Sequence, residues 1–239
     1  MISAFSIINN EQELVGYMLD SFARIVDLLD VLSIVDNDSS DDTLDIIHSY
    51  KDKLPIVVQR YSGLLEANHG VMRNLAMSKC RGDWILYADG DESWDTRFCD
   101  WLRTDEKEAY DIVDFFKYST IGDCYHYTDG GGGASTRLFR NVEGVTFDDP
   151  IHTYPRMSAN RKTMVSQDKA LWFDATSCKS WESLYAKSMR YLWAYGKVVG
   201  IGNEEEYTGR VSNAHRLGII REFEDATKAR IFTGKGVRK

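Results

Sequence analysis

Short apolar runs alternate with segments of helical periodicity through the first 95 residues of this chain. The apolar runs cover residues 2–8, 31–35, 56–58 and 84–88, and each has the length of a buried strand. The stretches between them carry apolar residues at helical spacing. Strands that alternate with helices form a mostly parallel sheet with helices packed on it. We therefore predict an α/β fold of the doubly wound type.

The second half of the chain has a less regular pattern. We predict strands over residues 112–118 and 135–140, with four consecutive glycines at 130–133 between them. Such glycines are typical either of a hairpin tip or of a loop that covers a site. Apolar residues at helical spacing over 181–195 and 217–232 predict a helical C-terminal part. Because no Pro- or Ser-rich linker divides the 239 residues, we expect a single domain.

The composition excludes several classes of protein. A formal net charge of −8 argues against extended nucleic-acid binding, which needs clustered Lys and Arg. The four cysteines are widely spaced without a Cys-x-x-Cys pair, so neither a zinc knuckle nor a disulfide framework is expected. No apolar run reaches the roughly 18 residues of a transmembrane segment, and residues 1–10 lack the basic flank of a signal peptide. We expect a cytoplasmic protein.

An acidic tetrapeptide, Asp89-Gly90-Asp91-Glu92, follows the fourth apolar run directly. Two carboxylates one residue apart at the end of a strand point to the same side and share one hard cation. Carboxylate oxygens suit Mg²⁺ or Mn²⁺, and proteins usually share these ions with substrate phosphates. We therefore predict that Asp89 and Asp91 bind a divalent metal that holds a diphosphate.

Other polar residues follow the first two predicted strands. The carboxyl ends of neighbouring parallel strands meet at one edge of a sheet, where such sheets bind ligands. An arginine on the helix before the fourth strand adds a cation that matches phosphate oxygens. The residues expected at this edge are Asn10, Glu11, Asp36, Asp38, Arg73, Asp89 and Asp91. Together they are suited to a nucleoside diphosphate.

Four segments, taken in order, resemble the motifs of family 2 glycosyltransferases with the GT-A fold. They are Asn10-Glu11, the loop at residues 35–43, the Gly-Val-Met-Arg-Asn-Leu-Ala helix at 70–76, and the strand and Asp-x-Asp at 81–92. The resemblance covers roughly residues 2–95. It implies a nucleotide-sugar-binding half at 1–95, an acceptor-side half at 96–178 and C-terminal helices at 179–239.

The resemblance also implies roles for single residues. Asn10 and Glu11 would lie beside the nucleotide. Asp36 and Asp38 would contact its base or ribose, and Arg73 its base or pyrophosphate. Asp89 would lie near the ribose and the metal, and Asp91 would bind the metal directly. We expect UDP in preference to GDP or dTDP, although Asn37 stands where another Asp is common.

A weaker match lies downstream, where residues 137–141 and 147–152 resemble a subgroup with Arg-x-Phe-Arg and a later His-Glu. Thr153 stands here in place of that glutamate. The remaining candidates for the general base are Asp149, which we prefer, Asp148 and His152. His152 is also a candidate ligand of the metal or of phosphate. Residues 148–150 are equally typical of a plain turn.

The resemblance implies a metal-dependent glycosyltransferase, using Mn²⁺ or Mg²⁺, that inverts configuration in one displacement on an acceptor hydroxyl. The acceptor is open among a glycan, a lipid-linked sugar, a protein and a modified base. Two alternatives stand beside this interpretation. One is a non-catalytic relative that binds nucleotide-sugars, favoured by the missing His-Glu. The other is a metal-dependent phosphatase that uses the Asp-x-Asp, although phosphatases usually carry that motif on the first strand.

Overall fold

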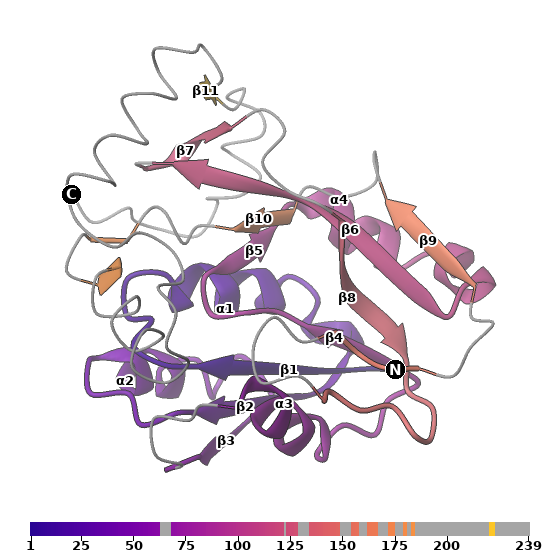
Figure 1. The fold of residues 1–239 in the computed structure, drawn as a ribbon, viewed down its shortest axis with the longest axis horizontal. Coiled ribbons are helices and arrows are strands. Elements are labelled where there is room, and N and C mark those ends of the chain that lie inside the picture. Colours follow the sequence, from indigo (N-terminus) through magenta and orange to yellow (C-terminus); the bar gives the residue numbers. More distant parts are fainter. Residues whose placement is uncertain are drawn as a thin grey trace.

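The computed structural model describes most of the first 148 residues and separate short segments after them (Figure 1). The described residues are 1–62, 68–121, 123–128, 134–148, 154–157, 162–166, 172–174, 179–180, 183–184 and 220–222.

The centre of the fold is a mixed sheet whose first four strands are parallel. These are β1 (Ile2–Ile8), β2 (Leu29–Asp36), β3 (Ile56–Arg60) and β4 (Trp84–Tyr87). β1 pairs with β2 on one side and with β4 on the other, so their carboxyl ends share one edge. β8 (Ala134–Arg140) lies antiparallel to β4, and β6 (Ile112–Ile121) lies antiparallel to β8. The order β6-β8-β4-β1-β2-β3 confirms the predicted α/β fold.

Further strands extend this sheet. β7 (Asp123–Thr128) and β11 (Ile220–Glu222) follow outward from β6, and β9 (Thr163–Ser166) also pairs with β6. β10 (Trp172–Asp174) joins β6 to β5 (Glu92–Trp94), the strand that directly follows the acidic loop. These five strands were not predicted from the sequence.

The helices that the sequence pattern predicts between the first four strands are present near the expected residues. The described helices are α1 (Val15–Ala23), η1 (Val26–Leu28), α2 (Thr43–His48), α3 (His69–Met77), α4 (Thr96–Leu102) and η2 (Asp105–Ala109). The N-cap residue of α3 is Asn68, whose side chain accepts a hydrogen bond from the Val71 N–H and so satisfies one free donor of the first turn. α4 was not predicted.

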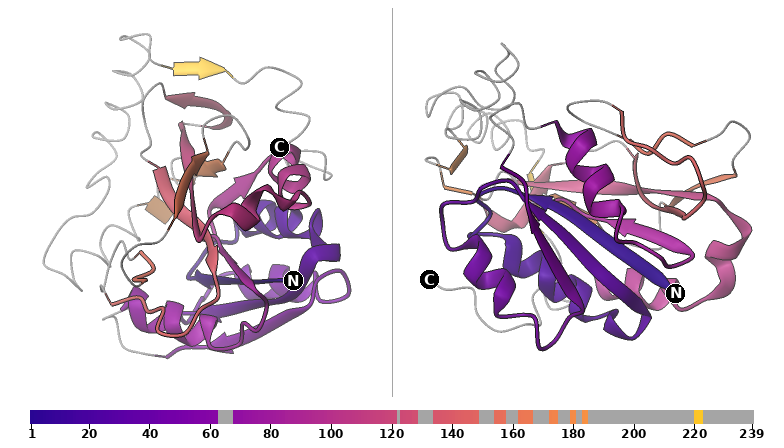
Figure 2. Two further views of the ribbon diagram at one scale, coloured as in Figure 1. Left: turned by 90° about the vertical axis from the view of Figure 1, so that its right-hand side faces the viewer. Right: turned by 90° about the horizontal axis from the view of Figure 1, so that it is seen from below.

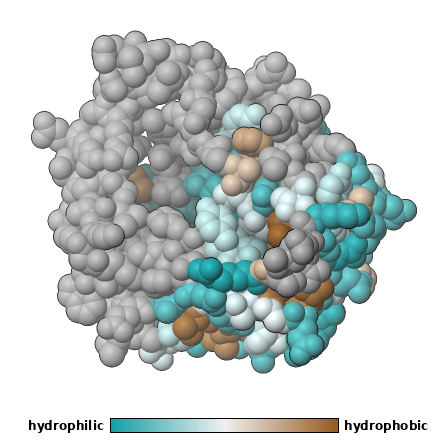
Figure 3. All heavy atoms as spheres, turned by 45° about the vertical axis from the view of Figure 1, so that its right-hand side comes forward, coloured by the Kyte–Doolittle hydropathy of each residue, from teal (hydrophilic) through white to brown (hydrophobic). Residues whose placement is uncertain are grey.

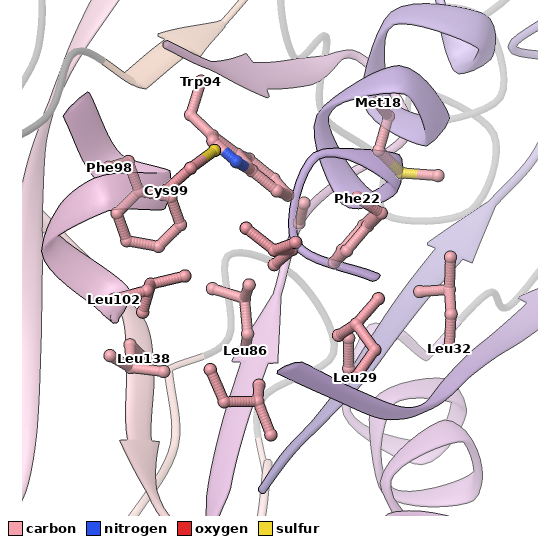
Figure 4. Close-up of a cluster of buried hydrophobic side chains, with 14 of the residues drawn as sticks. Met18, Phe22, Leu29, Leu32, Leu86, Trp94, Phe98, Cys99, Leu102 and Leu138 are labelled. Carbon is pink, nitrogen blue, oxygen red and sulfur yellow. The ribbon is translucent and has the colours of Figure 1, made fainter. Parts of the chain in front are cut away.

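Each face of the sheet is covered by a separate apolar cluster. Alternate residues of β4 divide between them, with Leu86 on one side and Tyr87 on the other. The larger cluster packs α1 and α4 against the sheet, and Figure 4 shows Phe22, Trp94 and Phe98 converging there. The smaller cluster packs α3 and residues 145–147 against the opposite face. In the views of Figure 2, α3 and the pair α1–α2 accordingly lie on opposite sides of the strands.

The described surface carries no large apolar patch on the face shown in Figure 3. Hydrophobic residues (brown) lie there in small groups among hydrophilic ones (teal). Every described helix is too short or too polar to cross a lipid bilayer.

Three predictions concern segments that lie largely outside the described residues. Within the helix predicted at 217–232, residues 220–222 instead form β11, because they pair with β7. Within the helix predicted at 181–195, only residues 183 and 184 are described; the Leu184 N–H donates to the Ser180 carbonyl over 3.0 Å, as in a helical turn. The glycines at 130–133 lie outside the described residues.

Candidate active site

The loops after β1 and β2 are joined by hydrogen bonds. The Asn10 N–H donates to Ser39 Oγ (2.9 Å), and the Ser40 N–H donates to Asn10 Oδ1 (2.8 Å). The Glu11 N–H donates to Thr43 Oγ1 (2.7 Å). Asn10 has φ 51°, in the left-handed region that Asn tolerates better than most residues. The two loops therefore form one structured rim, as predicted.

Asp36 ends β2 and is fully buried. Its carboxylate accepts a hydrogen bond from the Ser39 N–H at 3.2 Å. Arg60 at the end of β3 reaches both predicted base or ribose contacts, with Nε 3.7 Å from Asp36 and Nη2 3.8 Å from Asp38. Asp36 is thus held rigidly, whereas the Asp38 side chain is about half exposed.

Asp89 lies between two arginines. Arg73 Nη2 donates to Asp89 Oδ1 (2.6 Å), and Arg137 Nη2 lies 3.3 Å from Oδ2. Burial alone would raise the pKa of Asp89, but Arg73 and Arg137 outweigh it and lower the pKa to about 2. Both guanidinium groups also face the ring of Tyr87, at 4.9 and 4.7 Å from its centroid. Arg73, predicted to approach the nucleotide, is buried and pairs with Asp89.

A second group of charges continues from this pair. Arg137 donates from Nε to Glu92 Oε2 (2.7 Å), and Lys117 Nζ lies 3.0 Å from Glu92 Oε1. Lys117 also lies 3.4 Å from Asp174 of β10. Burial opposes the charge on Lys117, but Glu92 and Asp174 outweigh it, so its pKa is raised. Sequence reasoning did not assign Lys117 a role, and only the Arg-x-Phe-Arg match pointed to Arg137.

Asp91 faces Glu11 across the rim, and Lys179 lies between them. Lys179 Nζ is 2.7 Å from Glu11 Oε1 and 3.1 Å from Asp91 Oδ2. Gly90 permits this approach, because a Cβ at that position would lie 2.8 Å from Glu11 Cγ. We call the two carboxylates the Glu11–Asp91 cradle. No sequence pattern marked Lys179, which is 88 residues from Asp91.

The segment that carries the candidate base is fixed to α3. Asn74 Nδ2 donates to the Phe147 carbonyl, and the Phe147 N–H donates to Asn74 Oδ1, both over 2.9 Å. The next residue, Asp148, is exposed and lies 3.0 Å from Arg156 Nε. Asp149 and His152 lie outside the described residues, so their roles stay predictions.

This geometry agrees with a comparison of the sequence with known families. A model described as "Glycosyl transferase family 2" matches residues 3–168. The chain belongs to this family. The match confirms the resemblance seen in residues 2–95 and extends it through β6, β8 and β9.

Solved structures of other glycosyltransferases have a similar fold. The crystal structure of S. aureus TarS 1-349 is 17% identical with a TM-score of 0.57, covering 80% of this family 2 chain and 65% of that one. A mannosyltransferase, PcManGT from Pyrobaculum calidifontis in complex with GDP-Man and Mn²⁺, is 13% identical with a TM-score of 0.52, covering 90% and 69%.

The similarity to these structures establishes the GT-A fold. The chain spans only 43% of the longer TarS structure. No curated protein matches this family 2 chain.

The chemistry of the cradle fits the divalent ion that the resemblance implies. Its oxygens already bind one cation, the Lys179 ammonium. Among the described residues no three or more His, Cys, Asp or Glu side chains gather as a metal site. Mg²⁺ commonly needs only one or two carboxylates when it shares substrate phosphates. Glu11 and Asp91 thus provide two carboxylates that share one cation, whereas the two oxygens of Asp89 contact two different arginines.

Proposed function

We propose that this chain transfers a sugar from a nucleotide-diphosphate donor, with UDP as the expected nucleotide, to an acceptor hydroxyl. The observation that carries the proposal is that Asp36, Glu11 and Asp91 lie at one edge of the sheet, at or just after the carboxyl ends of three adjacent parallel strands. Such an edge is where open α/β sheets bind ligands. A TarS structure in complex with UDP-GlcNAc and the PcManGT structure in complex with GDP-Man, which share the fold, support a nucleotide-sugar donor.

The nucleoside would contact the rim made by the first two loops. Asp36 is a buried acceptor at the end of β2, and Asp38 and Asn10 lie on the same joined loops. A carboxylate fixed by a backbone N–H and approached by an arginine is suited to hydrogen bonds from a ribose or a base. Arg73 would act indirectly, by holding Asp89 in place.

The leaving diphosphate would lie over the cradle. A divalent ion, Mn²⁺ or Mg²⁺, held by Asp91 and Glu11 would neutralise charge on the diphosphate. Asp89 and His152 stay predicted as further ligands. Arg137 and Lys117 both pair with Glu92 behind Asp89. Their positive charges keep this acidic edge close to charge balance.

The acceptor hydroxyl needs a group that takes its proton during attack on the anomeric carbon. We propose Asp149 as this base, with inversion of configuration. Asn74 supports the assignment because its two bonds to Phe147 anchor the chain two residues before Asp149. Residues 1–95 would then bind the donor and residues 96–178 the acceptor, with Lys179 of the C-terminal part reaching back to the donor side.

A panel of nucleotide-sugars tests the proposal by thermal unfolding, each with Mn²⁺ and with EDTA. A ligand at 100 times its Kd adds about 2.7 kcal/mol, which is a shift of roughly 5–10 °C for a chain of this size. The matching donor is then assayed for transfer and hydrolysis. The proposal is supported if one donor selectively stabilises the chain and is turned over, and if Asp149→Asn abolishes that turnover. Selective stabilisation without turnover would leave the non-catalytic relative, and no stabilisation by any donor would contradict the function.

A further inference from the structure

Lys179 is bound to the cradle by three short contacts. Its Nζ lies 2.7 Å from Glu11 Oε1, 2.6 Å from Glu11 Oε2 and 3.1 Å from Asp91 Oδ2. The side chains of Lys179, Glu11 and Asp91 are only 3%, 9% and 6% exposed. A buried ammonium is stable only against anionic partners, and two buried carboxylates equally need a cation. Lys179 is therefore the cation of the cradle in this structure.

The backbone beside Lys179 is tied to the start of α1. The Ser180 N–H donates to Glu13 Oε2 (2.7 Å), and Ser180 Oγ donates to Glu13 Oε1 (3.0 Å). Ser183 Oγ makes a further hydrogen bond to Glu13 Oε1. Glu13 lies two residues after Glu11, so the same loop binds both the lysine and its neighbours. This attachment keeps the ammonium at a high local concentration beside the cradle.

The lysine lies where a divalent ion would have to bind. A Mg²⁺ ion takes carboxylate oxygens at about 2.0–2.1 Å, and an ammonium already lies within hydrogen-bonding distance of those oxygens. We propose that Lys179 and a divalent ion are alternative occupants of the Glu11–Asp91 cradle, so that metal loading requires displacement of the lysine. This proposal deepens the proposed function and rests on its assignment of a divalent ion to the cradle.

Competition lowers the apparent affinity for the metal. A site that is free of the lysine for only 1–10% of the time binds its ion about 10–100-fold more weakly than the bare site. Lys179→Met, which removes the ammonium and keeps the apolar stem, is expected to bind Mn²⁺ at least about tenfold more tightly than the parent. Lys179→Arg keeps the positive charge and should keep the weak affinity.

The experiment is a titration of the full chain with Mn²⁺ alone, in which free Mn²⁺ is measured by electron paramagnetic resonance. Adding Asp91→Asn to Lys179→Met should remove the tight site, which shows that the ion binds in the cradle. Lys107→Met is the matched control, because Lys107 is also a mostly buried lysine, lies 3.5 Å from a carboxylate oxygen of Glu108, and is at the end of β4 opposite to the rim. Its melting temperature should fall while its Mn²⁺ affinity stays at the parent value.

Loss of the lysine leaves two buried carboxylates together, so folding of Lys179→Met is checked by its melting temperature with and without Mn²⁺. If this variant does not fold, Ser180→Ala replaces it, since the loss of the Oγ bonds loosens Lys179 and should tighten Mn²⁺ binding by a smaller factor. Equal or weaker Mn²⁺ binding in the folded variant overturns the proposal. So does tight binding that survives Asp91→Asn, or the absence of Mn²⁺ binding in every variant. In each of those cases the proposed function is tested separately, by an assay of sugar transfer by the parent chain with Mn²⁺ and with EDTA.

Discussion

Asn74 on α3 closes a ring of two hydrogen bonds with the backbone of Phe147, each 2.9 Å long. Phe147 is buried, so its N–H and carbonyl depend on this side chain. We expect Asn74→Ala to lower the free energy of unfolding by about 1–3 kcal/mol, because a buried donor is left without a partner. Since the candidate base follows two residues later, kcat for sugar transfer should fall more than donor affinity.

Asn141 offers a control of the same residue type. Its Nδ2 donates to the Gly82 carbonyl over 2.8 Å, at the opposite end of the sheet from the rim. Asn141→Ala should cost about 0.5–1.5 kcal/mol of stability and leave kcat unchanged. Chemical denaturation and steady-state kinetics measure both quantities. Equal kinetics for Asn74→Ala and the parent would show that this clamp does not position the base.

Tyr87 stabilises the fold through its ring and not through its hydroxyl. Its Oη is buried without a hydrogen-bond partner in the described part of the chain, while its ring faces Arg73 and Arg137. Tyr87→Phe should therefore leave stability unchanged or raise it by up to about 1 kcal/mol, because an unsatisfied polar group is removed. Tyr87→Leu, which loses the ring, should cost about 2–4 kcal/mol. Urea unfolding compares them, and a large loss in Tyr87→Phe would reveal a partner for the hydroxyl.

The first four strands could be predicted because strands of a parallel sheet are buried on both faces and appear as continuous apolar runs. β5 and β10 could not, because each has three residues and Trp172 pairs with Trp94 across 78 positions of sequence. α4 follows the acidic loop closely and its short pattern was not recognised. Within the helix predicted at 217–232, residues 220–222 form β11 instead, because pairing with β7 prevails there over helical periodicity.

The site residues that lie at the ends of the predicted strands could be predicted from the sequence. Asp36 ends one strand, Glu11 and Asp91 follow two neighbouring strands, and all three lie at one edge of the sheet, as expected. The cations that complete the site, Lys117 and Lys179, come from distant segments, and a single lysine carries no local signal of its partner. The pairing of Arg73 with Asp89 was also not predicted, because the sequence does not show which carboxylate an arginine contacts.

Cys80 should make stability depend on alkaline pH. Burial raises the pKa of its thiol from 9.0 to about 12. Between these values the unfolded chain releases the thiol proton and the folded chain keeps it, so the folded state binds more protons and loses stability as pH rises above about 9. Cys80→Ala should show a shallower decline over this range, measured by urea unfolding at several pH values. Identical slopes, or rapid alkylation of native Cys80 at pH 9, would contradict the raised pKa.

Gly90 is required by the approach of Glu11. A Cβ at residue 90 would lie 2.8 Å from Glu11 Cγ and 3.3 Å from its Cβ, closer than side chains normally pack. We expect Gly90→Ala to push Glu11 out of the cradle, to lower the melting temperature, and to weaken binding of the matching donor with Mn²⁺ by about tenfold or more, a loss of about 1.4 kcal/mol. Isothermal titration calorimetry measures the affinity.

Gly16 in α1 is the matched control for this substitution. A Cβ there meets nothing within 4 Å, so Gly16→Ala adds only helix propensity and should stabilise the chain by about 0.5–1 kcal/mol without changing donor affinity. The two alanines thus separate a local steric effect from a general effect of losing glycine. Equal donor affinity in Gly90→Ala and Gly16→Ala would contradict this prediction. It would show that Glu11 can move without a loss of donor affinity, so that its position beside Asp91 does not affect donor binding.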